Sequence, residues 1–163
     1  MFDTHLTQLA ESVAGSLVER GDTISVAEGS CGGLISASLL AVPGASRYFV
    51  GGSVIYTATA TRAFMSGAVP TPEGLRGATE EFARYLARST ATKLSTTWGI
   101  GEGGAAGPAG NPYGDPAGHA WVAVAGAREA TRHVLTGQSD RPSNMVAFAR
   151  AALELLRDAL AEA

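Results

Sequence analysis

The stretch VAEGSCGGLISASLL, Val26–Leu40, decides how this chain folds, because a strand, a turn and a helix follow one another in and around it. The apolar, β-branched segment TISVA, 23–27, has the composition of a buried strand. The turn 28–33 then gathers an acid, a hydroxyl, the chain's single thiol and three glycines. GLISASLLAV, 33–42, reads as a helix that PGAS ends. A strand leading directly into a helix is typical of an α/β domain.

The turn 28–33 occupies a position at which proteins bind anions or hold a nucleophile. Exposed N–H groups and the positive end of a helix dipole favour a phosphate or a developing oxyanion there. Ser30 and Cys31 are the candidate nucleophiles, and each needs a base to accept its proton. Glycines at such corners also serve tight packing alone, so a functional and a structural interpretation both stay open.

Working outward from this stretch, helices and strands alternate along the chain. Leu6, Leu9, Val13 and Leu17 recur at helical spacing, and Thr79 offers an N-cap for a later helix. No internal repeat is visible, so we predict one layered α/β domain over 1–163 with a mixed sheet. The other expected elements are helices at 4–20, 57–65, 79–93 and from Pro142 onward, strands at 47–56, 95–101, 119–125 and 129–135, and loops at 67–78 and 99–118.

The composition excludes several classes of protein. The chain has no apolar run of membrane-spanning length, and its first residues lack the pattern of a secretory signal, so we expect a cytoplasmic protein. One cysteine excludes an internal disulfide and a cysteine-based zinc centre. A net charge of -3 does not suggest a nucleic-acid partner. Small-molecule chemistry or protein contact remains.

Few residues offer a base for the turn. Lys93 is the single lysine and stands at the end of an expected surface helix, and arginine does not act as a base because its pKa exceeds about 12. His5, His119 and His133 have no evident carboxylate partner. GIGEGG, 99–104, has dinucleotide-fingerprint spacing, but AAGP follows in place of a helix, so we interpret this match as chance. On these residues the catalytic equipment is incomplete.

Three stretches, in order along the chain, resemble the CinA C-terminal domain family, whose characterised members are nicotinamide mononucleotide amidohydrolases. AEGSCGG, 27–33, is similar to the family's Ala-Glu-Ser-Cys-Thr-Gly-Gly turn. GGSVIYTATAT, 51–61, is similar to a Gly-Gly strand that ends in Tyr-Ser-Asn-Glu-Ala-Lys, and AAGPAGNPYGDPAGHAWVAV, 105–124, to Ala-Gly-Pro, a loop and Pro-x-Gly before a strand. The resemblance implies a three-layer α/β/α sandwich with a mixed central sheet, and cleavage of the carboxamide of nicotinamide mononucleotide to the acid and ammonia.

Carried over without gaps, the family's two catalytic positions fall on residues that lack the required chemistry. The nucleophilic serine falls on Gly29, and the lysine five residues after Tyr56 falls on Thr61. Ser30 replaces the serine if the turn is shifted by one residue. Arg62, next to the lysine position, keeps a positive charge that can hold a phosphate or lower a hydroxyl's pKa, but it will not accept a proton.

Cys31 offers a different route, because a thiol pKa of about 8.5 falls further at a helix N-terminus or beside an arginine. Its alternative role is that of a small buried residue beneath the turn. The resemblance, with these repairs, gives Ser30, Cys31 and Tyr56 as candidate catalytic residues. The expected substrate-binding residues, most of which need only backbone groups, are Glu28, Gly32, Gly33, Gly51, Gly52, Arg62, Gly107 and Pro108.

Two hypotheses follow. The first is a protein of the competence/damage-inducible CinA type, related to nicotinamide-nucleotide amidohydrolases and weak, altered or inactive toward nicotinamide mononucleotide. The second is a non-catalytic nucleotide-binding or oligomer-partner protein. In either case we expect a small-molecule nucleotide ligand and a homo-oligomer, with no nucleic acid, membrane, metal or cofactor.

Overall fold

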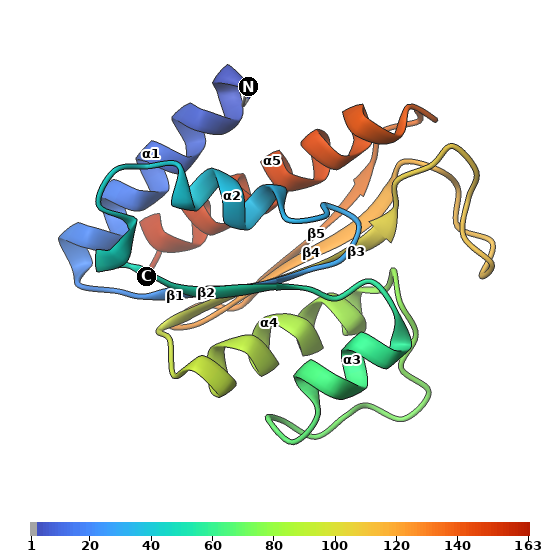
Figure 1. The fold of residues 1–163 in the computed structure, drawn as a ribbon, viewed down its shortest axis with the longest axis horizontal. Helices are drawn as coiled ribbons and strands as arrows, with labels where there is room; N and C mark the ends of the chain where they lie inside the picture. The colour runs from blue at the N-terminus through green and yellow to red at the C-terminus, as the bar shows by residue number, and fades with distance from the viewer. Residues whose placement is uncertain (1–2) are drawn as a thin grey trace.

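The computed structural model describes residues 3–163, which form a five-stranded sheet between two layers of helices (Figure 1). In chain order the elements are α1 (Thr4–Arg20), β1 (Ile24–Glu28), α2 (Leu34–Leu40), η1 (a 3₁₀ turn, Ala45–Arg47), β2 (Phe49–Val54), α3 (Ala58–Met65), α4 (Glu80–Leu94), β3 (Trp98–Ala105), β4 (His119–Ala125), β5 (Ala130–Leu135) and α5 (Arg141–Ala161). The strand order is β2-β1-β3-β4-β5. β1 runs parallel to β2 and β3, whereas β3–β4 and β4–β5 are antiparallel pairs.

Helices α1, α2 and α5 cover one face of the sheet, and α3 and α4 cover the other (Figure 1). The larger hydrophobic cluster packs the first helical layer on the sheet and includes Val13, Ile24 and Phe148. A smaller cluster on the other side includes Ile55 and Leu86. This arrangement confirms the expected three-layer α/β/α sandwich with a mixed sheet. Within residues 3–163, no helix is both long and apolar enough for a membrane span.

The four helices α1, α3, α4 and α5 begin where a side chain accepts one of their first free N–H groups. The capping side chains are Asp3, Thr57, Thr79 and Asp140. Such caps stabilise a helix by about 1 kcal/mol each. Helix α2 differs, because its N-cap is Gly33, which has no side chain. Another residue must therefore satisfy the first N–H groups of α2, and this residue belongs to the candidate site.

The glycine-rich segment 99–105 is a strand, in agreement with the strand expected at 95–101, so the expectation of a loop is wrong for 102–105. β3 passes through it as the central strand of the sheet. Helix α4 lies so close that a methyl group on Gly99 would overlap the carbonyl oxygen of Ala87, and one on Gly101 would overlap that of Ala83. The glycines therefore serve close packing of a helix on a strand. Close packing also explains the spacing of these glycines, so the spacing does not require a bound dinucleotide.

The parallel strands β1, β2 and β3 end at one edge of the sheet. Glu28, the last residue of β1, pairs with Val54 on one side and Glu102 on the other. In open α/β sheets, ligands bind outside the carboxyl ends of the strands. The turn that follows β1 starts at this edge.

Candidate functional site

A cavity of about 440 Å³ opens at this edge of the sheet. The turn after β1, the chain from the end of β2 into α3, the loop before α4 and the chain that follows β3 all contribute to its lining. Its volume falls in the range of small-molecule sites, roughly 300–1,000 Å³. The polar residues that line it include Ser30, Tyr56, Thr61, Arg62, Arg76 and Tyr113.

Ser30 is the candidate nucleophile that reaches this cavity. The residue is among those that line the cavity, although it is only 5% exposed. Its Oγ donates a hydrogen bond to Oε1 of Glu102, a fully buried residue of β3. The fold thus brings a hydroxyl at the cavity together with a carboxylate that the sequence analysis did not single out.

Two further hydrogen bonds hold the Glu102 carboxylate against the turn. Its Oε2 accepts from the N–H groups of Gly29, at 3.0 Å, and Cys31, at 2.9 Å. Burial raises the pKa of Glu102 despite the opposing effect of these hydrogen bonds, and the nearby Glu28 raises it further. An ionised carboxylate with a raised pKa is a stronger base than one in water.

Replacing Glu102 by glutamine is expected to stabilise the fold at about pH 8. The amide oxygen can accept both turn N–H groups while the amide nitrogen donates to the Ser30 hydroxyl, so Glu102→Gln keeps all three hydrogen bonds without a buried charge. Since the pKa of Glu102 is raised in the folded state, ionisation costs stability as pH rises through that value. In urea unfolding, the stabilisation should shrink as pH falls through the raised pKa of Glu102. A wild-type chain more stable than the variant at the higher pH would contradict this expectation.

Glu28 has a structural role at the start of α2 and does not line the cavity, so its expected role in substrate binding stays a prediction. The residue is fully buried. Its Oε2 accepts from the N–H of Ile35 at 3.0 Å, and its Oε1 accepts from the N–H and hydroxyl of Ser36 at 2.9 and 2.7 Å. The Glu28 side chain therefore already accepts hydrogen bonds from N–H groups in the first turn of α2. The anion site expected at this helix end is closed for that reason.

We expect Glu28→Gln to lower the free energy of unfolding by about 1–3 kcal/mol, the cost of an unsatisfied buried donor. The carboxylate accepts on both oxygens, whereas a glutamine at this position turns an N–H₂ group toward one of the helix N–H donors. Urea unfolding near neutral pH measures the change. A loss below about 0.5 kcal/mol, the usual range for a surface substitution, would contradict the capping role.

Cys31 lies beneath the turn and outside the cavity lining. The residue is 0% exposed, and its thiol donates to the carbonyl oxygen of Met145 at 3.7 Å. Burial raises the pKa of this thiol well above its ordinary value, and the charges of Glu102 and Glu28 add to the effect. A cysteine nucleophile needs the opposite environment, one that stabilises the thiolate. The structure therefore contradicts the Cys31 route and gives the residue the role of a small buried side chain.

The other expected glycines shape the backbone and do not line the cavity. Gly32 and Gly33 have φ angles of 64° and 102°, a conformation that glycine adopts readily, and they turn the chain into α2. Gly51 and Gly52 belong to β2. A methyl group on Gly52 would overlap the hydroxyl of Ser36, so this glycine allows α2 to approach the strand. None of these four residues lines the cavity, and their expected role in substrate binding stays a prediction.

Tyr56 lines the cavity, as expected, but its hydroxyl points to a partner other than the turn. It accepts a hydrogen bond from Nη2 of Arg141 at 3.1 Å, and Nη1 of the same guanidinium donates to the carbonyl oxygen of Gly107 at 2.8 Å. Gly107 and Pro108 lie in the chain after β3, outside the cavity lining. Arg141 therefore joins the second and third family-like stretches.

The residues at the family's two catalytic positions both line the cavity. A methyl group on Gly29 would stand 3.0 Å from the carbonyl oxygen of Ile55 and 3.4 Å from that of Glu102, which is tight without overlap. The hydroxyl of Thr61 donates to the carbonyl oxygen of Thr57 in its own helix, at 3.1 Å. Gly29 and Thr61, on which the resemblance places the family's serine and lysine, thus both border the cavity.

Two arginines line the cavity, and they differ in whether a carboxylate already pairs with the guanidinium group. Arg76 pairs with the carboxylate of Asp115 at 3.0 Å and lies over the ring of Tyr113, 4.8 Å from its centroid. Arg62 donates to the hydroxyl of Thr59 at 3.5 Å and has no carboxylate partner among residues 3–163. Arg62 is therefore the guanidinium that is available to an anion in the cavity.

The other residues considered as bases lie outside the cavity lining. His5 and Lys93 are exposed on α1 and α4. The Nε2 of His119 donates to the carbonyl oxygen of Ala78 at 2.8 Å, so its Nδ1 accepts from Nε2 of His133, at 2.9 Å. Among the described residues, no group of three histidine, cysteine, aspartate or glutamate side chains is arranged to hold a metal ion.

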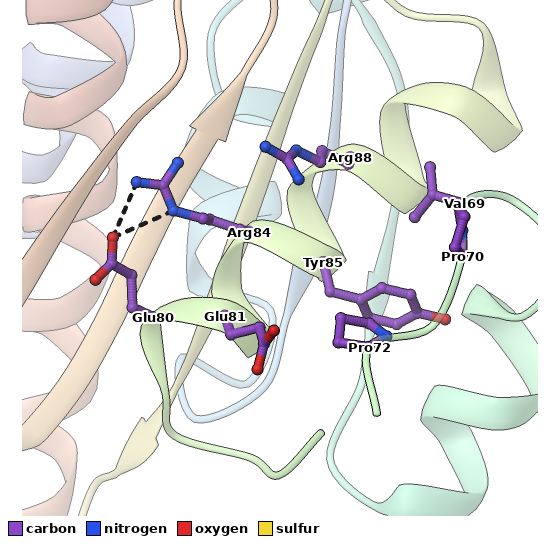
Figure 2. Close-up of a pocket in the computed structure, with 8 residues that line it drawn as sticks. All are labelled: Val69, Pro70, Pro72, Glu80, Glu81, Arg84, Tyr85 and Arg88. Atoms are coloured by element: carbon purple, nitrogen blue, oxygen red, sulfur yellow. Dashed lines mark hydrogen bonds and ion pairs between the residues drawn. The ribbon is translucent and has the colours of Figure 1, made fainter. Parts of the chain in front are cut away.

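A second hollow, of about 540 Å³, lies along α4 and the loop before it (Figure 2). Its two arginines are already paired, Arg84 with Glu80 at 2.9 Å and Arg88 with Glu129 at 2.6 Å. No serine, cysteine or histidine lines it, so we place the candidate site in the cavity at the turn. Its lining consists of Val69, Pro70, Pro72, Glu80, Glu81, Arg84, Tyr85 and Arg88.

Comparisons with known proteins agree on one family. The model of the CinA C-terminal domain matches residues 6–160, so this chain belongs to the CinA C-terminal domain family. A CinA-like protein of Acidobacterium capsulatum is 34% identical over 152 residues, which cover 91% of this chain and 36% of the relative. A CinA-like protein of Anaeromyxobacter sp. (strain K) is 36% identical over 156 residues, which cover 94% of this chain and 38% of the relative. The chain thus spans little more than a third of the length of these relatives.

Solved structures show the same fold. The competence/damage inducible protein CihA from Agrobacterium tumefaciens superposes with a TM-score of 0.89 at 25% identity, covering 99% of this chain and 98% of that chain. A competence-damaged protein (CinA) superfamily protein from Klebsiella pneumoniae gives a TM-score of 0.89 at 24% identity, covering 97% of this chain and 99% of that one.

Proposed function

We propose that this chain binds a phosphorylated pyridine nucleotide in the cavity at the turn and hydrolyses its carboxamide to the acid and ammonia. The observation that carries the proposal is Ser30, which lines the cavity and whose hydroxyl is hydrogen-bonded to the buried Glu102 carboxylate. Resemblance to a family with characterised nicotinamide mononucleotide amidohydrolases supports this substrate class. The expected turnover is slow, because Gly29 and Thr61 replace the family's pair.

The lining side chains suit the parts of such a ligand. Arg62 offers a planar fork of donors that matches a phosphate group. The rings of Tyr56 and Tyr113 offer apolar faces, and the positively charged pyridinium ring of nicotinamide mononucleotide is attracted to such faces. We place the phosphate at Arg62, the ring against a tyrosine and the carboxamide at Ser30.

Ammonia release from nicotinamide mononucleotide, with thermal unfolding in the same buffer, tests the proposal. We expect release in proportion to protein concentration. We also expect stabilisation by the nucleotide, which reaches about 2.7 kcal/mol at one hundred times the dissociation constant. The absence of both turnover and stabilisation at millimolar nucleotide would overturn the proposal.

Arg62→Met is expected to weaken binding of nicotinamide mononucleotide by roughly tenfold to one hundredfold, the loss of a charged hydrogen bond of about 1.5–3 kcal/mol. Binding of nicotinamide riboside, which lacks the phosphate, should change little. Isothermal titration with both ligands separates the two effects. Arg128→Met is the matched control. Arg128 follows β4 at the end of that strand that lies away from the cavity, and its guanidinium is paired with Glu162. Equal losses for the two ligands would contradict a phosphate contact.

A nucleotide-binding protein without turnover is the second candidate, favoured by Gly29 and Thr61 at the family's catalytic positions. It predicts nucleotide-induced stabilisation that depends on Arg62, with no ammonia release above the rate of a buffer blank. The expected homo-oligomer stays a prediction, and sedimentation of the purified chain measures it.

A further inference from the structure

We infer that Glu102 is the general base that activates Ser30, in place of the lysine that the family resemblance leads one to expect. The inference rests on the proposed function for its natural substrate, but the chemistry of the pair is measurable without that substrate. A serine at the cavity, a buried carboxylate and the hydrogen bond from the serine hydroxyl to that carboxylate carry it.

The two groups stand in the order that nucleophilic catalysis requires. Ser30 lies at the cavity surface, whereas Glu102 is 0% exposed and does not line the cavity. Substrate therefore approaches the hydroxyl from the cavity, and the carboxylate takes the proton from the opposite side. The turn fixes this arrangement, because its N–H groups at Gly29 and Cys31 hold the second carboxylate oxygen at 3.0 and 2.9 Å.

The reaction balances with these two groups and one water. The Ser30 oxygen attacks the carboxamide carbon while its proton passes to Glu102. The tetrahedral intermediate expels ammonia, which takes a proton from a cavity water, and leaves an ester on Ser30. The hydroxide formed from that water attacks the ester, and the Ser30 oxygen recovers its proton from Glu102 as the acid departs.

The turn also offers a donor for the developing oxyanion. The N–H groups of Gly29, Cys31 and Gly32 already have acceptors. The N–H of Ser30 has no acceptor among residues 3–163. The nucleophile's own N–H is a familiar oxyanion donor in serine hydrolases.

The buried surroundings of Glu102 set the direction of its pH dependence. The titratable groups that act on it are Glu28 and Cys31, both buried, and no cation is among the causes of its shift. The base is active when ionised, so reactivity should fall as pH drops through its raised pKa. This fall in reactivity should occur at a higher pH than the titration of an ordinary glutamate.

Labelling of Ser30 by a small alkyl fluorophosphonate tests the pair without any nucleotide. Ser30 attacks phosphorus, fluoride leaves, and Glu102 takes the proton. Mass spectrometry of the peptide that contains Ser30 gives the rate. We expect Glu102→Gln to slow labelling by about 10²- to 10⁴-fold, the usual contribution of a general base. Arg128→Met, a change at the other end of β4 from the cavity, should label at the wild-type rate.

The wild-type pH profile keeps the test independent of how well the variant folds. A labelling rate that rises with pH and then levels off supports an ionising base, whereas one that climbs in proportion to hydroxide up to about pH 10 overturns it. Equal rates for a folded Glu102→Gln variant and the wild type also overturn the inference. Labelling that depends on Glu102 without ammonia release from nicotinamide mononucleotide upholds the pair and rejects the proposed substrate.

Discussion

The Ser30→Ala variant is expected to lose ammonia release from nicotinamide mononucleotide by at least about 10³-fold, because removal of a nucleophile leaves only the weak catalysis that binding supplies. Its affinity for the nucleotide should stay within about threefold of wild type, since Arg62 and the two tyrosines are unchanged. Steady-state ammonia assays and isothermal titration measure the two quantities.

Cys31→Ala is the matched control for this experiment. It removes the neighbouring nucleophilic atom of the same turn, but the Cys31 thiol is buried and its pKa is raised. Ammonia release by Cys31→Ala should therefore remain near the wild-type rate. Full activity in Ser30→Ala, or loss of activity in Cys31→Ala without loss of folding, would assign the chemistry to another group.

The largest expected effect on stability is that of Gly101→Ala, at about 3 kcal/mol or more, the upper range for overpacking. A methyl group there would overlap the carbonyl oxygen of Ala83, a backbone atom of α4 that moves only if the helix moves. Urea unfolding measures the loss.

Gly15→Ala is the control, because Gly15 has open space around it on α1, and alanine in a helix interior is worth about 0.5–1 kcal/mol over glycine. The same substitution should therefore act in opposite directions at the two positions. Similar effects at both would contradict close packing of α4 on β3.

Local rules were sufficient to predict most of the fold. Helical periodicity gives α1 with the bounds Thr4–Arg20, and the threonine at 79 gives the start of α4. β3 was predicted only in its first half: its start lies in the expected strand 95–101, whereas 102–105 was read as a loop because glycine has low strand propensity. The reason for glycine at 99 and 101 is the backbone of α4, which contacts the strand from far along the chain. No local rule contains that contact.

The candidate site was predictable to a smaller extent. Ser30 and Arg62, expected as a catalytic and a substrate-binding residue because the turn and the family-like stretches mark them, both line the cavity, and their roles stay predictions. Glu102 was missed since its segment read as a loop, where an acid needs no explanation. A lone glutamate in a buried central strand would have been a signal, because buried carboxylates are rare without a partner or a function.

The capping role of Glu28 was missed for a related reason. Its position at the turn is the same for a ligand-binding residue and for a helix cap, and only the distances to Ile35 and Ser36 separate the two. The two buried glutamates of the site thus divide the roles, with Glu28 capping α2 and Glu102 facing Ser30.

A crystal structure of Glu102→Gln with nicotinamide mononucleotide bound tests the central claim most directly, since this variant should bind the nucleotide without hydrolysing it. The account predicts the phosphate at Arg62 and the carboxamide carbon within about 3.5 Å of the Ser30 oxygen, a reactive distance. A nucleotide bound outside the cavity, or one whose carboxamide faces away from Ser30, would contradict it.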